Sequence, residues 1–205
     1  KSLDTPTVIP SENFNTVLYT GNATARSITG VGFAPDFTWI KDRSSTYSHN
    51  LYDTVRGANN ILFSDTAAGQ DTATSNRLTA FDADGFTLGN GVAVNANGNA
   101  HVAWNWKAGG SASSNTNGSM LFKNRTSSVE WQVFAESEGA GEYGVLDSTA
   151  AFAASAIWQN TLPTSSVFSI GNFSGVNTNA ENYIAYAFHS VDGYSKVGSY
   201  TGNGS

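Results

Sequence analysis

The sequence contains no cysteine, which excludes a disulfide framework and any metal site built from thiolates. Charged side chains are also scarce: they make up 13% of the 205 residues, against the ~25% of ordinary globular domains. No stretch approaches the ~18 consecutive apolar residues that a membrane-spanning helix needs. We therefore expect no membrane insertion. The absence of cysteine does not tell whether the protein works in an oxidising or a reducing compartment.

Basic residues are few. The chain has 10 Lys and Arg against 16 Asp and Glu, which gives a net charge of −6. The basic side chains are too scattered to follow a phosphate backbone, so nucleic acid is not an expected partner. Aromatic residues make up 12% and glycine is abundant, with 21 copies, and Ser, Thr and Asn are plentiful. This composition is typical of an ordered all-β protein, in which hydroxyls and amides cover the exposed strands.

The most informative pattern is an internal repeat in which the first half returns in the second at one constant offset, from position 39 to position 121. Four blocks recur at this offset: Trp39–Ser45 as Leu121–Ser127, Phe86–Asn90 as Phe168–Asn172, Val94–Asn97 as Val176–Asn179, and His101–Trp106 as Tyr183–Phe188. A fixed internal period indicates duplicated architecture. The recurring positions are mainly apolar and turn positions, so the repeat describes a scaffold, and no catalytic set repeats with it.

A second repeat joins the two ends of the chain, because Tyr19–Asn22 reappears as Tyr200–Asn203. We expect residues 200–205 to be the start of a further tandem unit or a C-terminal tail. Residues 1–15 are expected to be a linker or the end of a preceding module. The alternative is a common turn sequence that recurs by accident.

Short β-rich runs separated by turn signals follow one another along the chain. The predicted strands are Thr16–Thr20, Phe37–Lys41, Asn50–Val55, Ile61–Ser64, Leu78–Phe81, Phe86–Leu88, His101–Trp106, Met120–Lys123, Glu130–Ala135, Tyr143–Leu146, Val167–Ile170, Tyr183–Phe188 and Ser195–Tyr200. Many short strands favour an antiparallel β-sandwich of the jelly-roll or concanavalin-like type. Thr149–Trp158 carries five alanines and is the best candidate for a short helix or helical turn.

Residues 109–118 consist of Gly, Ser, Asn and Thr apart from Ala112, which indicates a flexible connection. It joins the halves 16–110 and 118–199. Each half has too few strands to bury both faces of a sheet. We therefore predict a single sandwich domain over residues 16–199, in which the two related sheets pack face to face.

The repeated polar pattern is Lys-x-Arg-Ser/Thr-Ser, which contains Arg43 in the first half and Arg125 in the second. The guanidinium groups could bind an anionic ligand or a carboxylate. Alternatively, the arginines brace neighbouring loops at the polar end of a strand. The structural alternative is favoured, because duplicated residues usually serve the duplicated fold.

Three tryptophans are candidate ligand-binding residues. Trp104 and Trp106 lie two apart on a predicted strand, so both should face the same side of a sheet. An exposed pair would stack on sugar rings, and a buried pair would be core, which the aromatic counterparts Tyr186 and Phe188 favour. Trp158 lies outside the predicted strands and is the better candidate for an exposed contact.

Asp82 and Asp84 resemble a fragment of a calcium loop, although no third ligand and no closing Glu follow. The alternative is a turn in which the aspartates accept bonds from their own backbone. No cofactor is expected, and calcium is the one metal to test. Glu136, Glu138 and Glu142 cluster as a glycosidase would require, but they flank a glycine-rich loop and are expected to be solvated. No catalytic motif is present, so we expect a protein that is not an enzyme.

Several blocks of the chain, in order, resemble a recurring domain of marine and cyanobacterial phage proteins. These blocks are Tyr19–Asn22, Val31–Lys41, Leu51–Gly57, Phe81–Gly89, Val102–Gly110 and Gly193–Gly204. The resemblance implies a virion-associated or tail-fibre-like protein, often in tandem copies. It also implies a fold similar to the concanavalin-like sandwich of lectins and laminin G modules. It offers no catalytic residue to carry over.

From these observations we expect a non-enzymatic structural module exposed on the surface of a phage virion, as a capsid decoration, horn or tail-fibre component. Its expected partners are other virion proteins and copies of itself. The alternative is a carbohydrate-binding adhesion module that recognises host-surface glycans. A glycan depolymerase is a third and weaker alternative, because no strand-borne pair of carboxylates supplies its chemistry.

Overall fold

The computed structural model describes residues 9–72, 76–108, 118–191, 195–198 and 200–204. Within these residues the fold is all-β, with antiparallel strands in three sheets and two α-helices of four residues each. The chain divides into two compact units, residues 1–110 and residues 111–205. The all-β antiparallel class is thereby confirmed, whereas the packing of the two halves into one domain stays a prediction.

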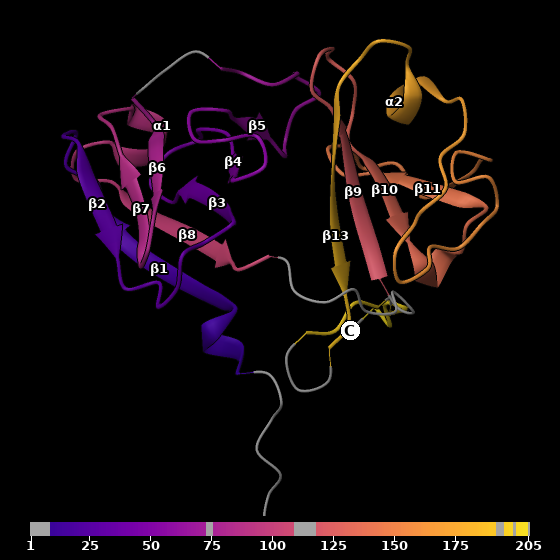
Figure 1. Cartoon of the computed structure of the whole chain (residues 1–205), viewed down its shortest axis with the longest axis horizontal. Helices are drawn as coiled ribbons and strands as arrows, with labels where there is room; N and C mark the ends of the chain where they lie inside the picture. The colour runs from indigo at the N-terminus through magenta and orange to yellow at the C-terminus, as the bar shows by residue number, and fades with distance from the viewer. Residues whose placement is uncertain (1–8, 73–75, 109–117, 192–194, 199, 205) are drawn as a thin grey trace, which may run out of the picture. The chain divides into compact units, whose positions relative to one another are not determined.

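The first unit contains a five-stranded sheet in the order β1-β8-β3-β4-β5 and a three-stranded sheet in the order β2-β7-β6 (Figure 1). The strands are β1 (Phe14–Thr20), β2 (Arg26–Thr29), β3 (Phe37–Asp42), β4 (Asn50–Asp53), β5 (Leu62–Phe63), β6 (Leu78–Asp82), β7 (Gly85–Leu88) and β8 (Ala100–Trp106). A 3-10 turn, η1 (Pro10–Glu12), precedes β1, and a helical turn, α1 (Val92–Asn95), precedes β8.

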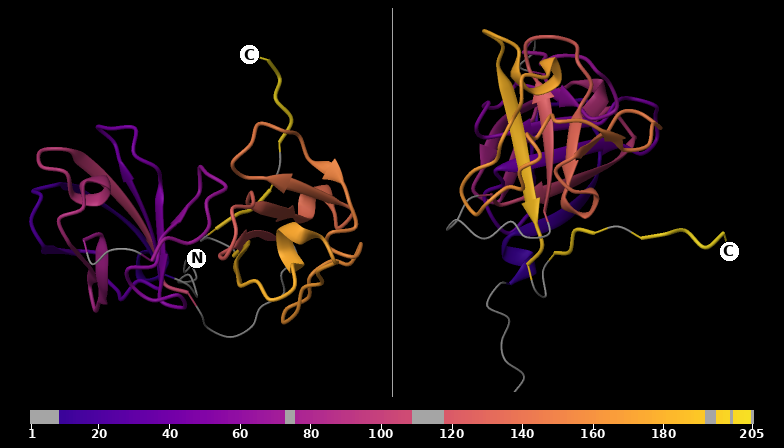
Figure 2. Two further views of the ribbon diagram at one scale, coloured as in Figure 1. Left: turned by 90° about the horizontal axis from the view of Figure 1, so that it is seen from above. Right: turned by 90° about the vertical axis from the view of Figure 1, so that its right-hand side faces the viewer.

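The core of the first unit lies between its two sheets, which Figure 2 shows from two further directions. Alternate residues of a strand face one side, so Ile40 and Ala103 point from the large sheet into this core. Phe86 and Leu88 point into it from the small sheet. All four side chains are fully buried.

The second unit contains one five-stranded sheet in the order β12-β11-β10-β9-β13 (Figure 1). Its elements are β9 (Gly118–Asn124), β10 (Gln132–Ala135), η2 (Glu136–Glu138), β11 (Glu142–Val145), β12 (Ala153–Ala154), α2 (Ser174–Asn177) and β13 (Tyr183–His189). Its own core gathers Met120, Phe122, Phe134, Ala140, Ile157, Trp158 and Val176. No helix in the part of the chain that the structure describes is long and apolar enough to cross a membrane.

The two units share their strand register at the offset of the sequence repeat, which confirms the internal duplication. Trp39 pairs with Trp104 in the first unit, and Leu121 pairs with Tyr186 in the second. Three more pairs of the first unit have a counterpart in the second at the same offset. Phe37 pairs with Asp53 as Ser119 pairs with Ala135, and Asn50 pairs with Phe63 as Gln132 pairs with Val145. Ile61 bridges to Asp71 as Tyr143 pairs with Ala153. β8, β3, β4 and β5 therefore correspond to β13, β9, β10 and β11.

The second unit lacks counterparts of β1, β2, β6 and β7 among its described residues. The prediction of a strand at Val167–Ile170 is wrong, although the hairpin turn is kept: the N–H of Thr164 donates to the carbonyl of Val167 at 2.8 Å. One difference from the first unit accompanies the loss of the ladder: no counterpart of β2 covers the other edge in the described part of this unit.

Trp158 lies in the core of the second unit. The predicted helix at Thr149–Trp158 is therefore wrong, because Ala153–Ala154 pairs with β11 instead and the chain then turns into the core. The helical turns form in the repeated Val-Asn blocks instead. The Ser195–Tyr200 prediction is not met by a strand in its described residues: Ser195 makes one bridge to Val191.

Candidate functional site

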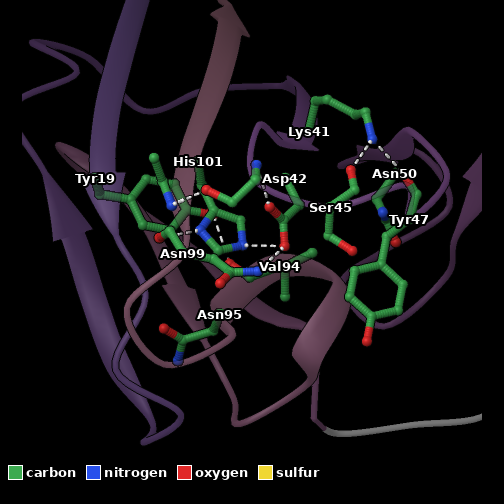
Figure 3. Close-up of polar contacts among 12 residues, drawn as sticks. Tyr19, Lys41, Asp42, Ser45, Tyr47, Asn50, Val94, Asn95, Asn99 and His101 are labelled. Carbon is green, nitrogen blue, oxygen red and sulfur yellow. Dashed lines mark hydrogen bonds and ion pairs between the residues drawn. The ribbon is translucent and has the colours of Figure 1, made fainter.

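Asp42 sits at the end of β3 and joins the turn that follows to the loop before β8 (Figure 3). Its Oδ2 accepts a hydrogen bond from Asn99 Nδ2 at 2.8 Å, and its Oδ1 accepts one from the N–H of Ser44 at 2.8 Å. The N–H of Arg43 donates to the carbonyl of Ala100 at 2.8 Å. We call Asp42 and Asn99 the first clamp, because together they fix two loops.

His101 lies beside the first clamp and is fully buried, as is Asp42. Its Nδ1 is 3.0 Å from the carbonyl of Asn99, and its Nε2 is 3.5 Å from Asp42 Oδ2 without a hydrogen-bond partner. The ring of Tyr19 stacks on it at 5.0 Å (Figure 3). Burial lowers the pKa of His101 below its ordinary value, with Asp42 opposing that effect. A neutral, enclosed imidazole next to a carboxylate has the parts of an acid–base pair but offers no access to a substrate.

The second unit makes the same clamp from exchanged residues. Asn124 replaces Asp42 and Glu181 replaces Asn99, and the Asn124 amide donates to the Glu181 carboxylate. The N–H of Thr126 donates to Asn124 Oδ1 at 2.9 Å, as Ser44 does in the first unit. Tyr183 takes the place of His101, and its hydroxyl accepts from Asn124 Nδ2 at 3.2 Å. Hydrogen bonds from Ser127 and Asn124 lower the pKa of Glu181.

The repeated lysines brace the same turn. Lys41 Nζ donates to the carbonyls of Ser45 at 3.1 Å and Tyr47 at 2.5 Å (Figure 3). Lys123 donates to the carbonyl of Val129, which is the counterpart of Tyr47. Burial lowers the pKa of Lys123 to about 8, with Asp147 and Glu130 acting in the opposite direction. The lysine of the repeated motif thus serves the turn in both units.

The two arginines of the motif occupy matched positions. The N–H of Arg125 donates to the carbonyl of Asn182 at 2.8 Å, which repeats the bond from Arg43 to Ala100. The side chain of Arg43 is exposed and that of Arg125 is half-buried. The backbone N–H groups of the arginines therefore join the loops, and the lysines hold the turn, while a role of the guanidinium groups in ligand binding stays a prediction.

The loop between α1 and β8 holds the turn that follows β1. Gly21 makes the closest approach, because a Cβ at this position would lie 2.1 Å from the carbonyl oxygen of Ala96. We call Val94, Asn95, Gly98 and Asn99 the first cradle. The hydroxyl of Tyr19 donates to the carbonyl of Val94 at 2.7 Å, and the N–H of Asn22 donates to Asn95 Oδ1 at 3.0 Å. The N–H of Gly21 donates to the carbonyl of Asn99 at 2.9 Å, and the carbonyl of Gly21 accepts from the N–H of Gly98 at 2.9 Å.

Trp104 and Trp106 face the same side of the large sheet, as their spacing predicts, and that side is opposite the core between the sheets. Both are half-buried. Trp104 meets Trp39 edge-to-face with ring centroids 6.2 Å apart, and Trp106 packs on Phe37 at 5.1 Å and on Phe14 at 4.9 Å. We call these five residues the tryptophan face. The expectation that Trp104 and Trp106 are buried core residues is therefore met only in part, because both rings are half-buried.

Trp158 is 1% exposed, so the expectation of an exposed contact is wrong. Its ring packs on Phe122 at 4.9 Å and on Phe134 at 5.8 Å, and its Nε1 donates to the carbonyl of Glu142 at 2.9 Å. The ring thus packs on the face of β9 and β10 that corresponds to the Ile40 face of the first unit, and the described residues of the second unit form no small sheet there. Sequence reasoning misplaced it because its position in the first unit is Asn76, which gives no sign of burial.

Asp82 and Asp84 both accept hydrogen bonds from the first unit itself. Asp84 accepts from the N–H groups of Gly32 at 2.6 Å and Gly30 at 3.1 Å, which lowers the pKa of its carboxyl. Asp82 Oδ2 accepts from Thr87 Oγ1 at 2.7 Å. These bonds reach a neighbouring segment and the opposite strand of the hairpin, so the aspartates serve the fold of the first unit in a different way from the predicted turn with its own backbone. Among the residues placed by the structure, no group of three or more His, Asp or Glu side chains could hold a metal ion, and a calcium role stays a prediction.

The fold and its polar clusters define a duplicated all-β module whose repeated polar residues fix loops. The family described as Domain of unknown function (DUF7483) matches residues 9–121 and again residues 119–205. The chain therefore belongs to this family and carries its sequence twice. No curated protein sequence and no solved structure matches the chain.

Proposed function

We propose that this chain is a non-enzymatic structural module of a phage particle, exposed on the particle surface. The observation that carries the proposal is the exchanged clamp. Asp42 with Asn99 and Asn124 with Glu181 make the same contact with acid and amide interchanged. A hydrogen bond between the two loops forms whichever loop carries the acid. Acid–base catalysis would instead require the carboxylate at one fixed position, so the exchange argues for a structural role. The polar residues are thus explained by loop positioning.

The assignment to a phage particle is supported by the resemblance of the ordered blocks to virion-associated and tail-fibre-like proteins. A low content of charged residues and a net charge of −6 suit a surface that meets other particle proteins and copies of itself. Rigidity would come from the sheets, and contacts would come from strand edges, loops and the terminal segments.

The experiment is immunogold electron microscopy of native particles with an antibody raised against this chain. Regular label at fixed positions on capsid or tail is the expected result. Label absent from particles but present on cells or in the medium would refute the proposal. A matched control uses serum depleted on the purified chain, which must remove the label.

The tryptophan face favours a second candidate, a carbohydrate-binding adhesion module. Trp39 and Trp104 are half-exposed indoles held at a fixed angle, and His49 Nδ1 accepts from Trp39 Nε1 at 2.7 Å. Exposed rings of this kind stack on sugars. Titration with host polysaccharide should quench tryptophan fluorescence, and Trp104→Ala should abolish the response. Trp158→Phe, a change in the buried core, is the control that must retain it; an unchanged response of Trp104→Ala would reject this candidate.

A further inference from the structure

We infer that the second unit carries an acceptor site for an extended strand of another protein, a basic strand in which an apolar residue is flanked by polar ones. The site is Val167–Ile170, which we call the acceptor segment. Its counterpart in the first unit is β7, which lies between β6 and β2 and pairs with both (Figure 1). This inference goes beyond the proposed function and does not depend on which particle carries the module.

The backbone of the acceptor segment has few hydrogen-bond partners. Within the described part of the chain, the N–H groups of Phe168, Ser169 and Ile170 donate no hydrogen bond, and the carbonyls of the first two accept none. The carbonyl of Ile170 accepts from Gln159 Nε2 at 2.7 Å. Unpaired backbone groups along an extended segment are a template for pairing with another chain. The acceptor segment thus offers a ladder that β7 already uses in the first unit.

Large apolar side chains on this hairpin are exposed. Val167 is 63% exposed, Leu162 in the preceding arm of the hairpin is 50% exposed, and Phe168 is 44% exposed. At the places of the first two, the first unit has only the small residues Gly85 and Ala80. A group of exposed large apolar side chains marks an interaction surface. Unpaired backbone and uncovered apolar side chains therefore coincide on one segment.

β2 shows which kind of strand fits this position. Its Ile28 lies opposite Phe86 and is 3% exposed in the core of the first unit. The second unit has no such residue of its own, because the positions that correspond to β2 read Ala-Gly-Gly-Ser, with Gly110 at the place of Ile28. A second copy does not offer its β2 either, since that strand is paired with its own β7. The donor is therefore a strand of another protein.

Charge complementarity favours a basic donor. Between Arg125 and Lys196 the sequence contains no Lys or Arg. The same stretch contains seven acidic residues: Glu130, Glu136, Glu138, Glu142, Asp147, Glu181 and Asp192. β2 itself carries Arg26 two residues before its apolar residue. A donor with this pattern is attracted to the acidic second unit, and added salt weakens the attraction.

The register of β2 on β7 predicts which backbone groups of the donor are used. The carbonyl oxygen of Ile28 faces β7, because a Cβ at Gly85 would lie 2.0 Å from it. The N–H and carbonyl of one strand residue point to the same edge, so the N–H of Ile28 also faces β7, while those of Ser27 and Thr29 point away. The donor residue opposite Phe168 therefore uses its N–H in the ladder, and its two neighbours do not.

The probe is a synthetic peptide with the sequence of residues 24–31, blocked at both ends, and its binding to the full chain is measured by fluorescence anisotropy. We expect saturable binding that weakens as salt is added. The peptide does not displace β2 from the first unit, because β2 is tethered beside β7. Two N-methylated peptides form a matched pair. Methylation at the Ile28 position should weaken binding at least about tenfold, and methylation at the Ser27 position should change it less than about twofold.

The absence of saturable binding up to about 1 mM peptide would overturn the inference, as would equal weakening by the two methyl groups. In the chain, Phe168→Ala should weaken peptide binding at least about fivefold. Val55→Ala, at an 82% exposed side chain of the first unit, is the control that should leave binding unchanged; equal effects of the two substitutions would place the peptide elsewhere and overturn the inference. Sedimentation of the chain alone tests the other occupant. A dimer that the peptide dissociates would assign the acceptor segment to a second copy and overturn the choice of another protein.

Discussion

Phe86 and Phe168 are counterparts in the internal repeat, and they test whether the second unit lacks its small sheet. Phe86 lies in β7 and is fully buried, whereas Phe168 lies outside any strand and is 44% exposed. Phe168 still meets Phe122 edge-to-face at 5.2 Å, so it is packed on one side only. We expect Phe86→Ala and Phe168→Ala to differ strongly in their cost.

The magnitude follows from burial and from the cavity left behind. A fully buried Phe→Ala change costs ~3–5 kcal/mol, because the lost transfer free energy adds to an unfilled cavity. Phe168 is only partly buried, since 44% of it is exposed, and water can fill the space that its ring leaves. Its transfer contribution is then about half that of a buried ring, and the cavity contribution is small. Phe168→Ala should therefore cost below ~2 kcal/mol.

Hydrogen exchange read by mass spectrometry measures the opening free energy of each unit in the full chain. Phe86→Ala should lower the protection of β3, β7 and β8 by ~3–5 kcal/mol, and Phe168→Ala should lower that of β9, β10 and β13 by less than ~2 kcal/mol. Equal losses in the two units would refute the reasoning, because they would mean that Phe168 is enclosed by a second layer as Phe86 is.

Three further predictions follow from individual contacts. Gly21→Ala should destabilise the first unit by more than ~2 kcal/mol in urea unfolding, because its Cβ would lie 2.1 Å from a backbone oxygen, while Gly202→Ala should leave the unfolding free energy of the monomer unchanged. Trp158→Ala should cost ~3–5 kcal/mol in the second unit, and a cost under ~1 kcal/mol would contradict its role as core filler. His101 has a folded pKa below the ordinary 6.5, so the first unit should lose stability as the pH falls below about 6.5 and show no such loss above it. Asp42, Tyr19 and Arg26 face this imidazole, and His101→Gln should flatten the pH profile of thermal unfolding.

The sequence predicts most strands of both units and the duplication, because alternation and turn residues act locally and the scaffold positions repeat. It does not predict that Val167–Ile170 forms no strand, because that outcome goes with the absence of a neighbouring strand among the described residues. Nor does it predict the clamp. Asp42 and Asn99 are far apart in the chain, and their link shows in the sequence only as an acid and an amide that trade places at Asn124 and Glu181. Comparing the two halves for exchanged pairs, as well as for identical ones, would have found it.

The two units share a scaffold but differ in what completes it. The first unit supplies its own β1, whose Tyr19 and the following Gly21 fill the first cradle. The second unit keeps the register of β13 and the left-handed turn at Ala180 while lacking that strand among its described residues. Strain at a loop persists only where surrounding contacts maintain it. The clamp between Asn124 and Glu181 supplies one such contact at the end of the loop. Ala180→Gly should therefore stabilise the chain by about 1 kcal/mol in urea unfolding, because glycine adopts this left-handed conformation without strain, and an unchanged unfolding free energy would contradict the reasoning.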